Sequence, residues 1–246
     1  MIRFIDEQGM ISPIAVEGIN ADTAITAFSP HIFNELLRVT GAKFLKRVPG
    51  GCDVDVYTFN NNGKPIVVYR SPIGAPAAAA TAEEILACGV KKIIAFGICG
   101  TLISTPPQTI IVPTEAYRDE GTSYHYLPES QKIAVKNCDT VGRVLNSLGI
   151  KTVVGGVWTT DGFYRETKTR ADEMRKNGCV AVDMECSALQ AVADFRGKHF
   201  YTFFISADSL AGEEWQPNDI LQLEVTDSTT VACTAAVKLA QAVSDK

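Results

Sequence analysis

Three acidic residues follow short apolar segments whose length and composition are typical of buried strands. They are Asp161, which follows the segment 152–157, Glu185, which follows 180–182, and Asp208, which follows 200–206. The carboxyl ends of strands meet at one edge of an open α/β sheet, so acids far apart in the sequence can lie close together there. Carboxyl groups in such a place can accept hydrogen bonds from hydroxyls and can transfer a proton to a leaving group.

The segment 180–189, Val-Ala-Val-Asp-Met-Glu-Cys-Ser-Ala-Leu, places two carboxylates, Asp183 and Glu185, between a strand and a helix. Buried carboxylates cost free energy unless they are hydrogen-bonded, and a polyol ligand could supply those hydrogen bonds. Alternatively, Asp183 caps the N-terminus of the following helix, and Glu185 is an acid of its first turn, where negative charge is favourable. The residues of this segment support the two interpretations about equally.

Aromatic residues accompany the acid that follows the segment 152–157, namely Trp158, Phe163 and Tyr164. A site with flat apolar walls and a few carboxylates suits a base attached to a sugar. The aromatic rings would stack on the base, while the acids bind hydroxyls and protonate the leaving group. Against this, aromatic residues after a strand usually belong to the core, which is the better interpretation for any single one of them.

A further candidate element is the run Gly97-Ile98-Cys99-Gly100, which follows an expected strand at 91–96. Backbone N–H groups of glycine-rich turns can bind phosphate, so Gly97 is a candidate substrate-binding position. One short Gly-x-x-Gly is weak evidence, and a tight turn without a ligand is the favoured interpretation.

Segments with strand and helix character alternate along nearly the whole chain. Strands are expected at 23–27, 54–59, 65–69, 91–96, 109–112, 152–157, 180–182 and 200–206. Helices are expected at 30–39, 77–88, 132–148, 168–177 and 226–243 and after Glu185, and loops at 116–128 and 209–224. This alternation predicts an α/β fold, a sheet covered by helices on both faces. No linker or repeat divides the chain, so a single domain is expected over residues 1–246.

The composition narrows the possible functions. Hydrophobic residues make up 46% and charged residues 21% of the chain, the profile of a globular protein. The net charge of −5 and the lack of a basic run give no support to nucleic-acid binding. Seven cysteines without a Cys-x-x-Cys favour reduced thiols in the cytoplasm, and the three histidines lack the spacing of zinc ligands. No segment has the length of a membrane span or the pattern of a signal peptide.

The segment 182–189, Val-Asp-Met-Glu-Cys-Ser-Ala-Leu, resembles the Met-Glu ribose-binding motif of the nucleoside phosphorylase and nucleosidase superfamily. The resemblance is closest to the uridine phosphorylases and the hexameric purine nucleoside phosphorylases. Further segments follow the family order at the expected intervals: 21–30, 63–65, 72–76, 89–100, 119–128, 159–164 and 206–208. The resemblance covers nearly all of the chain and implies a three-layer α/β/α domain with a central mixed, twisted sheet.

The resemblance also implies roles for individual residues. Glu185 matches the glutamate that accepts hydrogen bonds from the ribose 2′- and 3′-hydroxyls, and Met184 matches the methionine beneath the sugar. Phe163 and Trp158 match aromatic residues that flank the base. Asp208 lies where purine-cleaving members keep the general acid for the purine N7.

Two positions argue against a pyrimidine base. The uridine enzymes read uracil with a Gln and an Arg after the Phe-Tyr pair, and these places hold Thr167 and Thr169 here. The resemblance therefore points toward purine nucleosides.

The phosphate-binding residues of the family have no counterpart in this chain. Phe28 and Ile32 stand where the family has a Gly and an Arg after the first strand. Ala95 replaces an Arg before the glycine run, and Ile98 replaces a Ser or Thr within that run. Cys52 replaces an Arg that the neighbouring subunit donates. Arg47 is the nearest basic substitute for the last of these. A dianion needs several charge-assisted donors, so we expect an apolar pocket here. Glu17 does not match the glutamate that activates water in the hydrolytic relatives.

Two hypotheses of different classes follow. The first is an enzyme, a pentosyltransferase or N-ribosyl hydrolase, that cleaves the N-glycosidic bond of a purine nucleoside. Phosphorolysis is the family default, with phosphate as co-substrate and no other cofactor, whereas the altered pocket favours hydrolysis. The second is a nucleoside-binding protein without efficient turnover, against which the retention of both Glu185 and Asp208 argues.

The resemblance further implies a homodimer or a homohexamer built as a trimer of dimers. The loop 119–128 is a candidate interface element, although ordinary packing of a surface loop explains its sequence as well.

Overall fold

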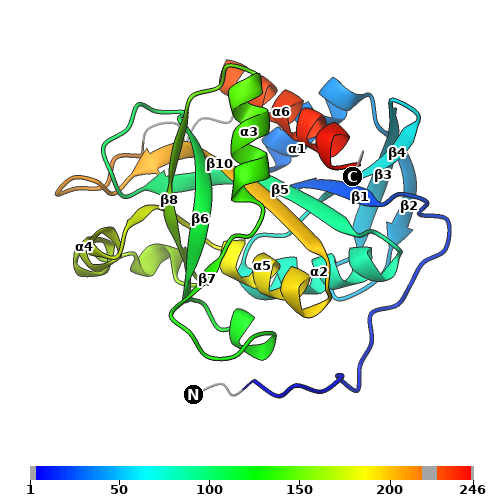
Figure 1. Ribbon diagram of the computed structural model, residues 1–246, viewed down its shortest axis with the longest axis horizontal. Coiled ribbons are helices and arrows are strands. Elements are labelled where there is room, and N and C mark those ends of the chain that lie inside the picture. Colours follow the sequence, from blue (N-terminus) through cyan, green and yellow to red (C-terminus); the bar gives the residue numbers. More distant parts are fainter. Residues whose placement is uncertain (1–3, 218–225, 245–246) are drawn as a thin grey trace.

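The computed structural model describes residues 4–217 and 226–244, which contain one mixed ten-stranded sheet (Figure 1). The strands are β1 (Thr23–Ala27), β2 (Lys43–Val48), β3 (Val54–Asn61), β4 (Lys64–Arg70), β5 (Lys92–Thr101), β6 (Ile110–Asp119), β7 (Lys132–Ala134), β8 (Thr152–Thr160), β9 (Cys179–Asp183) and β10 (His199–Ser209). The helices are α1 (Pro30–Thr40), α2 (Ala75–Ala87), α3 (Cys138–Ser147), α4 (Lys168–Lys176), α5 (Cys186–Phe195) and α6 (Asp227–Ser244), with the 3-10 helices η1 (Ser123–His125) and η2 (Phe163–Arg165). Within the described ranges, no helix is both long enough and apolar enough to cross a bilayer.

Helices cover both faces of the sheet, which confirms the predicted α/β fold. In Figure 1, α1, α3 and α6 lie on one side of the sheet, and α2 and α5 lie on the other. The core on the first side contains Ile25, Leu36 and Phe203, each fully buried. Packing of this kind removes apolar side chains from water and is the main stabilising contribution to such a fold.

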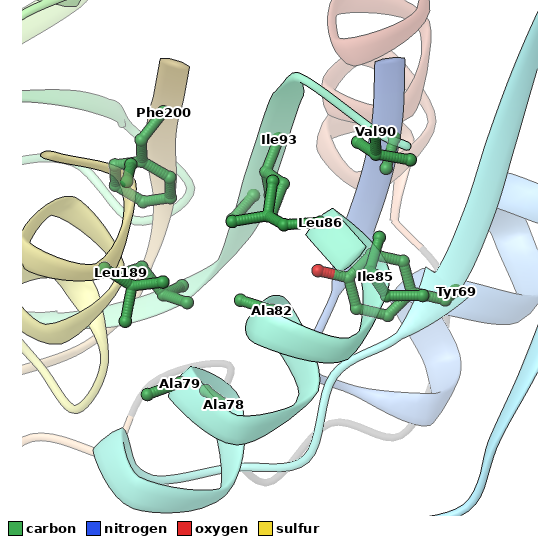
Figure 2. Close-up of a cluster of buried hydrophobic side chains, with 14 of the residues drawn as sticks. Tyr69, Ala78, Ala79, Ala82, Ile85, Leu86, Val90, Ile93, Leu189 and Phe200 are labelled. Atoms are coloured by element: carbon green, nitrogen blue, oxygen red, sulfur yellow. The ribbon is translucent and has the colours of Figure 1, made fainter. Parts of the chain in front are cut away.

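The core on the second side depends on the small residues of α2. Ala78, Ala79 and Ala82 are each about 1% exposed, and their size allows the helix backbone to lie close to its neighbours. Figure 2 shows them in one cluster with Leu189 of α5 and Phe200 of β10. This packing fixes α2 and α5, whose N-terminal ends border the site described below.

Five strands of the sheet close into a ring. β5 pairs in parallel with β10, β10 antiparallel with β6, β6 in parallel with β8, and β8 in parallel with β9. β9 then returns to pair antiparallel with β5, with Gly100 opposite Val182. On β10, Asp208 lies opposite Gly100, after a bulge that follows Ser206. The closure therefore brings the carboxyl ends of β5, β9 and β10 to one place.

The run Gly97-Ile98-Cys99-Gly100 is part of β5, so the expected tight turn is wrong. Its residues continue the ladder between β5 and β10 as far as Gly100. Gly97 is needed for space and not for a turn, because a Cβ atom there would lie 2.9 Å from Cδ2 of Phe28.

Other differences from the expected elements arise where a strand is polar, because such a strand lacks the apolar pattern from which strands are predicted. The edge strand β2 was not predicted, because its exposed side chains include Lys43 and Arg47. The expected loop 116–128 begins as the last part of β6, and the expected helix 132–148 begins with β7 before α3 starts at Cys138. The expected loop 209–224 is described only as far as residue 217.

Candidate active site

A cavity of about 250 Å³ lies where the strand ends meet. Its walls come from residues in or after the carboxyl-terminal parts of β1, β4, β5, β8, β9 and β10. Most of the wall is apolar: Phe28, Ile73, Ile98, Phe163, Val182 and Met184. The polar side chains that line it are Ser29, Glu166, Asp183, Glu185 and Asp208. An apolar cavity with a few convergent polar groups is the usual form of a small-molecule site.

The side chain of Asp183 caps the N–H groups at the start of α5, as one of the two interpretations of its segment proposed, although Glu185 is the N-cap residue itself. Its Oδ2 accepts hydrogen bonds from the backbone N–H groups of Glu185, at 3.0 Å, and Cys186, at 2.7 Å. Its Oδ1 accepts a hydrogen bond of 2.7 Å from the hydroxyl of Thr159. Burial raises the pKa of Asp183, and these three donors oppose that rise. Asp183 therefore serves mainly to hold the turn that presents Glu185.

Glu185 makes no cap hydrogen bond with α5, and its side chain lies against the cavity instead. Its Oε1 accepts a hydrogen bond of 2.6 Å from the backbone N–H of Gly74. Gly74 has φ of 96°, a backbone conformation that favours glycine. Burial and the charge of Asp183 raise the pKa of Glu185. A buried carboxylate held in this way has a strong tendency to accept further hydrogen bonds from a ligand.

Asp208 follows the bulge in β10, and its side chain lines the cavity. Bulges occur next to active sites because they redirect a side chain. The indole N–H of Trp215 donates a hydrogen bond of 2.7 Å to Oδ2 of Asp208. Burial raises the pKa of Asp208, and this hydrogen bond opposes the rise. A carboxyl group with a raised pKa can carry the proton that a general acid needs.

Glu166 lines the same cavity and was missed by the sequence analysis. Burial, followed by the charges of Asp208 and Asp183, raises its pKa to about 7. Its place three residues after Phe163 is the available signal, but the family resemblance singles out the neighbouring Thr167 and Thr169. Thr167 instead caps α4, because its hydroxyl accepts a hydrogen bond from the N–H of Arg170.

The aromatic residues that were expected to flank the base, Phe163 and Trp158, lie in different environments. Phe163 lines the cavity, 39% exposed, with Tyr164 against its edge. Trp158 lies outside the cavity wall and is 1% exposed, in a core cluster that includes Leu102 and Met174. Its indole N–H donates to Asp119 at 2.9 Å. The structure thus places Phe163 on the cavity wall and Trp158 in the core.

Two further candidates also lie outside the cavity wall. Gly97 packs beneath the Phe28 ring and so supports the wall without lining it. Asp161 is exposed and accepts a hydrogen bond from the N–H of Gly121 at 3.0 Å.

The residues that replace the family's phosphate-binding side chains also lie partly in the cavity wall and partly in the core. Phe28 and Ile98 line the cavity, whereas Ile32 and Ala95 are buried in the two cores. Arg47 pairs with Asp55 at 2.7 Å on the exposed edge of the sheet and is not a cavity residue. Among the described residues that line the cavity, no side chain is basic and four are carboxylic acids. Such a lining disfavours a bound dianion.

An α/β sheet with carboxylates and an aromatic wall at its strand ends has the usual form of a small-molecule site at the sheet edge. The chain belongs to the phosphorylase superfamily, whose family model matches residues 22–244. The matched range contains the whole cavity lining.

Relatives of similar sequence match most of the chain. It is 27% identical over 231 residues to the purine nucleoside phosphorylase DeoD-type of Shewanella sp. (strain MR-4), covering 92% of this chain and 97% of the relative. It is 28% identical over 204 residues to the purine nucleoside phosphorylase DeoD-type of Aliivibrio salmonicida (strain LFI1238), covering 80% and 86%. These similarities agree with the purine-directed resemblance noted in the sequence.

Proposed function

We propose that this protein is an enzyme that cleaves the N-glycosidic bond of a purine nucleoside. The observation that carries the proposal is that Glu185, Phe163 and Asp208, far apart in the sequence, line one cavity. Glu185 accepts hydrogen bonds from the ribose 2′- and 3′-hydroxyls, and Met184 packs beneath the sugar. Phe163 lies against the base, and Asp208 donates a proton to N7. The names of the relatives support the purine class.

The chemistry follows from these positions. A proton from Asp208 lets the purine accept the electron pair of the bond between C1′ and N9, so the base leaves as a neutral molecule. Positive charge develops on the ribose ring, as in an oxocarbenium ion. The ionised form of Asp183, which lines the same cavity, stabilises that charge electrostatically. A nucleophile then adds to C1′, and when that nucleophile is water, the proton that it loses restores the carboxylic acid of Asp208 or passes to solvent.

We further propose that the nucleophile is water. A phosphate dianion would need several charge-assisted donors, and the described lining supplies carboxylic acids instead. Phe28 and Ile98 carry no ionisable group that could activate a nucleophile. This last observation favours a second candidate function, a nucleoside-binding protein without efficient turnover.

Phosphate is expected to have no effect on cleavage. Adenosine, inosine, guanosine and uridine would be incubated with the protein in phosphate-free buffer and in phosphate, with free base measured by chromatography. The proposal predicts equal release of purine base in both buffers, and free ribose in place of ribose 1-phosphate. Strictly phosphate-dependent release, with ribose 1-phosphate as product, would contradict hydrolysis. Binding without release would favour the second candidate.

Gly100→Ala is expected to lower the cleavage rate by about tenfold to a hundredfold, because it displaces Asp208. A Cβ atom at Gly100 would lie 2.9 Å from Cγ1 of Val182 and 3.2 Å from Oδ1 of Asp208. The matched control is Gly142→Ala on α3, where a Cβ atom meets nothing within 4 Å. Steady-state kinetics on both variants would check this. Equal rates for Gly100→Ala and Gly142→Ala would show that a Cβ atom at position 100 does not displace Asp208.

A further inference from the structure

Glu166 differs from the other carboxyl groups of the cavity in having no partner. Asp183 accepts three hydrogen bonds, Glu185 accepts one from Gly74, and Asp208 accepts one from Trp215. Within residues 4–217 and 226–244, no side chain or backbone group forms a hydrogen bond or ion pair with Glu166. A half-buried carboxyl group on a cavity wall, with no protein partner, is free to accept hydrogen bonds from a ligand that carries donors.

Glu166 and Asp208 also influence each other. Both line the cavity, and the charge of Asp208 is the second largest cause, after burial, of the raised pKa of Glu166. Two carboxyl groups in one low-dielectric site resist being ionised together, so near neutral pH such a pair tends to hold one proton. The pair then presents one donor and one acceptor. Because N7 of a bound purine can only accept a hydrogen bond, a purine whose N7 faces Asp208 places the shared proton on Asp208 and leaves Glu166 as the acceptor.

We propose that Glu166 is a specificity residue that accepts a hydrogen bond from the 6-amino group of an aminopurine nucleoside while Asp208 donates to N7. This inference rests on the proposed function, which places Asp208 at N7. The N7 and C6 substituents lie on the same edge of a purine. A 6-aminopurine presents an acceptor and a donor there, which complements a carboxylic acid beside a carboxylate.

A 6-oxopurine presents two acceptors at the same edge. Binding it would require both carboxyl groups to be protonated, or would leave the Glu166 carboxylate facing a carbonyl oxygen. Sites built to hydrogen-bond one substituent reject an analogue that leaves their polar groups unpaired. The substrate class is therefore adenosine and related 6-amino nucleosides.

The test compares adenosine with inosine. For the unmodified protein we expect kcat/KM for adenosine to exceed that for inosine by about tenfold or more, the usual range for a charged hydrogen bond. Glu166→Gln should reduce this ratio about tenfold, because an amide can donate to a 6-oxo group and loses the charge that favours a 6-amino group. The matched control is Glu173→Gln on α4, since Glu173 pairs with Arg170 on the surface and should leave the ratio unchanged. Thermal unfolding of both variants would verify that each is folded.

The outcomes separate this inference from the proposed function. Cleavage of purine nucleosides without a preference for adenosine, or an unchanged ratio in Glu166→Gln, would overturn the role of Glu166 and leave the proposed function standing. If no nucleoside is cleaved, calorimetric binding of adenosine and inosine replaces kinetics. Tighter binding of adenosine that is lost in Glu166→Gln would then support the role of Glu166 while overturning cleavage. Equal binding of the two, or none, would overturn both.

Discussion

Asp208→Asn is expected to lower kcat for adenosine cleavage by about 10²–10⁴-fold, the usual contribution of a general acid. Asparagine has nearly the same shape and can still accept the hydrogen bond from the Trp215 indole, but it has no proton to give to N7. The matched control is Asp161→Asn, because Asp161 also follows a strand but lies outside the cavity wall. Undiminished turnover in the Asp208 variant would remove Asp208 from the proposed role.

The pH dependence should change in the same variant. Burial raises the pKa of Asp208, so its protonated, active form persists to higher pH than for an ordinary aspartate. The rate in the unmodified protein should therefore fall as pH rises through that pKa. The residual rate of Asp208→Asn should lack this fall, and an identical pH profile in both proteins would assign the acid to another group.

Glu185→Gln is expected to lower kcat/KM by about a hundredfold or more, because two hydrogen bonds from ribose hydroxyls to a charged acceptor are weakened. Glutamine can keep the hydrogen bond from Gly74, so the 72–76 loop should hold its position. The protein should retain its unfolding temperature or gain slightly, because a buried carboxylate is removed from beside Asp183.

The substrate provides the matching control for Glu185. The unmodified protein should discriminate strongly against 2′,3′-dideoxyadenosine, which lacks both hydroxyls. In a double-mutant cycle, the loss caused by Glu185→Gln and the loss caused by removing the hydroxyls should not add, because they delete the same interaction. Additive losses would place Glu185 away from the ribose.

Much of the fold follows from local sequence. The predicted helix 30–39 begins where expected because Ser29 accepts a hydrogen bond from the N–H of His31 and Pro30 occupies the first turn. The hairpin of β3 and β4 turns at Asn62 and Gly63, both with positive φ. These signals are readable because a cap or a turn depends on a few neighbouring residues.

The closure of the five strands into a ring could not be predicted from local sequence in this way. The antiparallel meeting of β5 with β9 joins residues about eighty positions apart, and no local pattern encodes it. The glycines of β5 suggested a turn because glycine is common in turns. Their observed purpose is to admit Phe28 and Val182, which only the packed structure reveals.

The residues of the site that belong to one contiguous motif could be predicted from the sequence. Those whose place in the cavity depends on the burial of a single side chain could not. Asp183, Met184 and Glu185 form one contiguous signal, and they all line the cavity. Trp158 and Phe163 lie on either side of a strand end, and sequence does not determine which of the two faces the core. Glu166 resembles any acid at the start of a surface helix until its burial is known.

The most direct measurement of the central claim is a crystal structure of the Asp208→Asn variant with adenosine, grown or soaked in phosphate. We predict ribose 2′- and 3′-hydroxyls within hydrogen-bond distance of Glu185, the purine against Phe163 with N7 facing position 208, and no anion density beside Phe28 and Ile98. Adenosine bound elsewhere, or a phosphate ion ordered next to the ribose, would contradict the account.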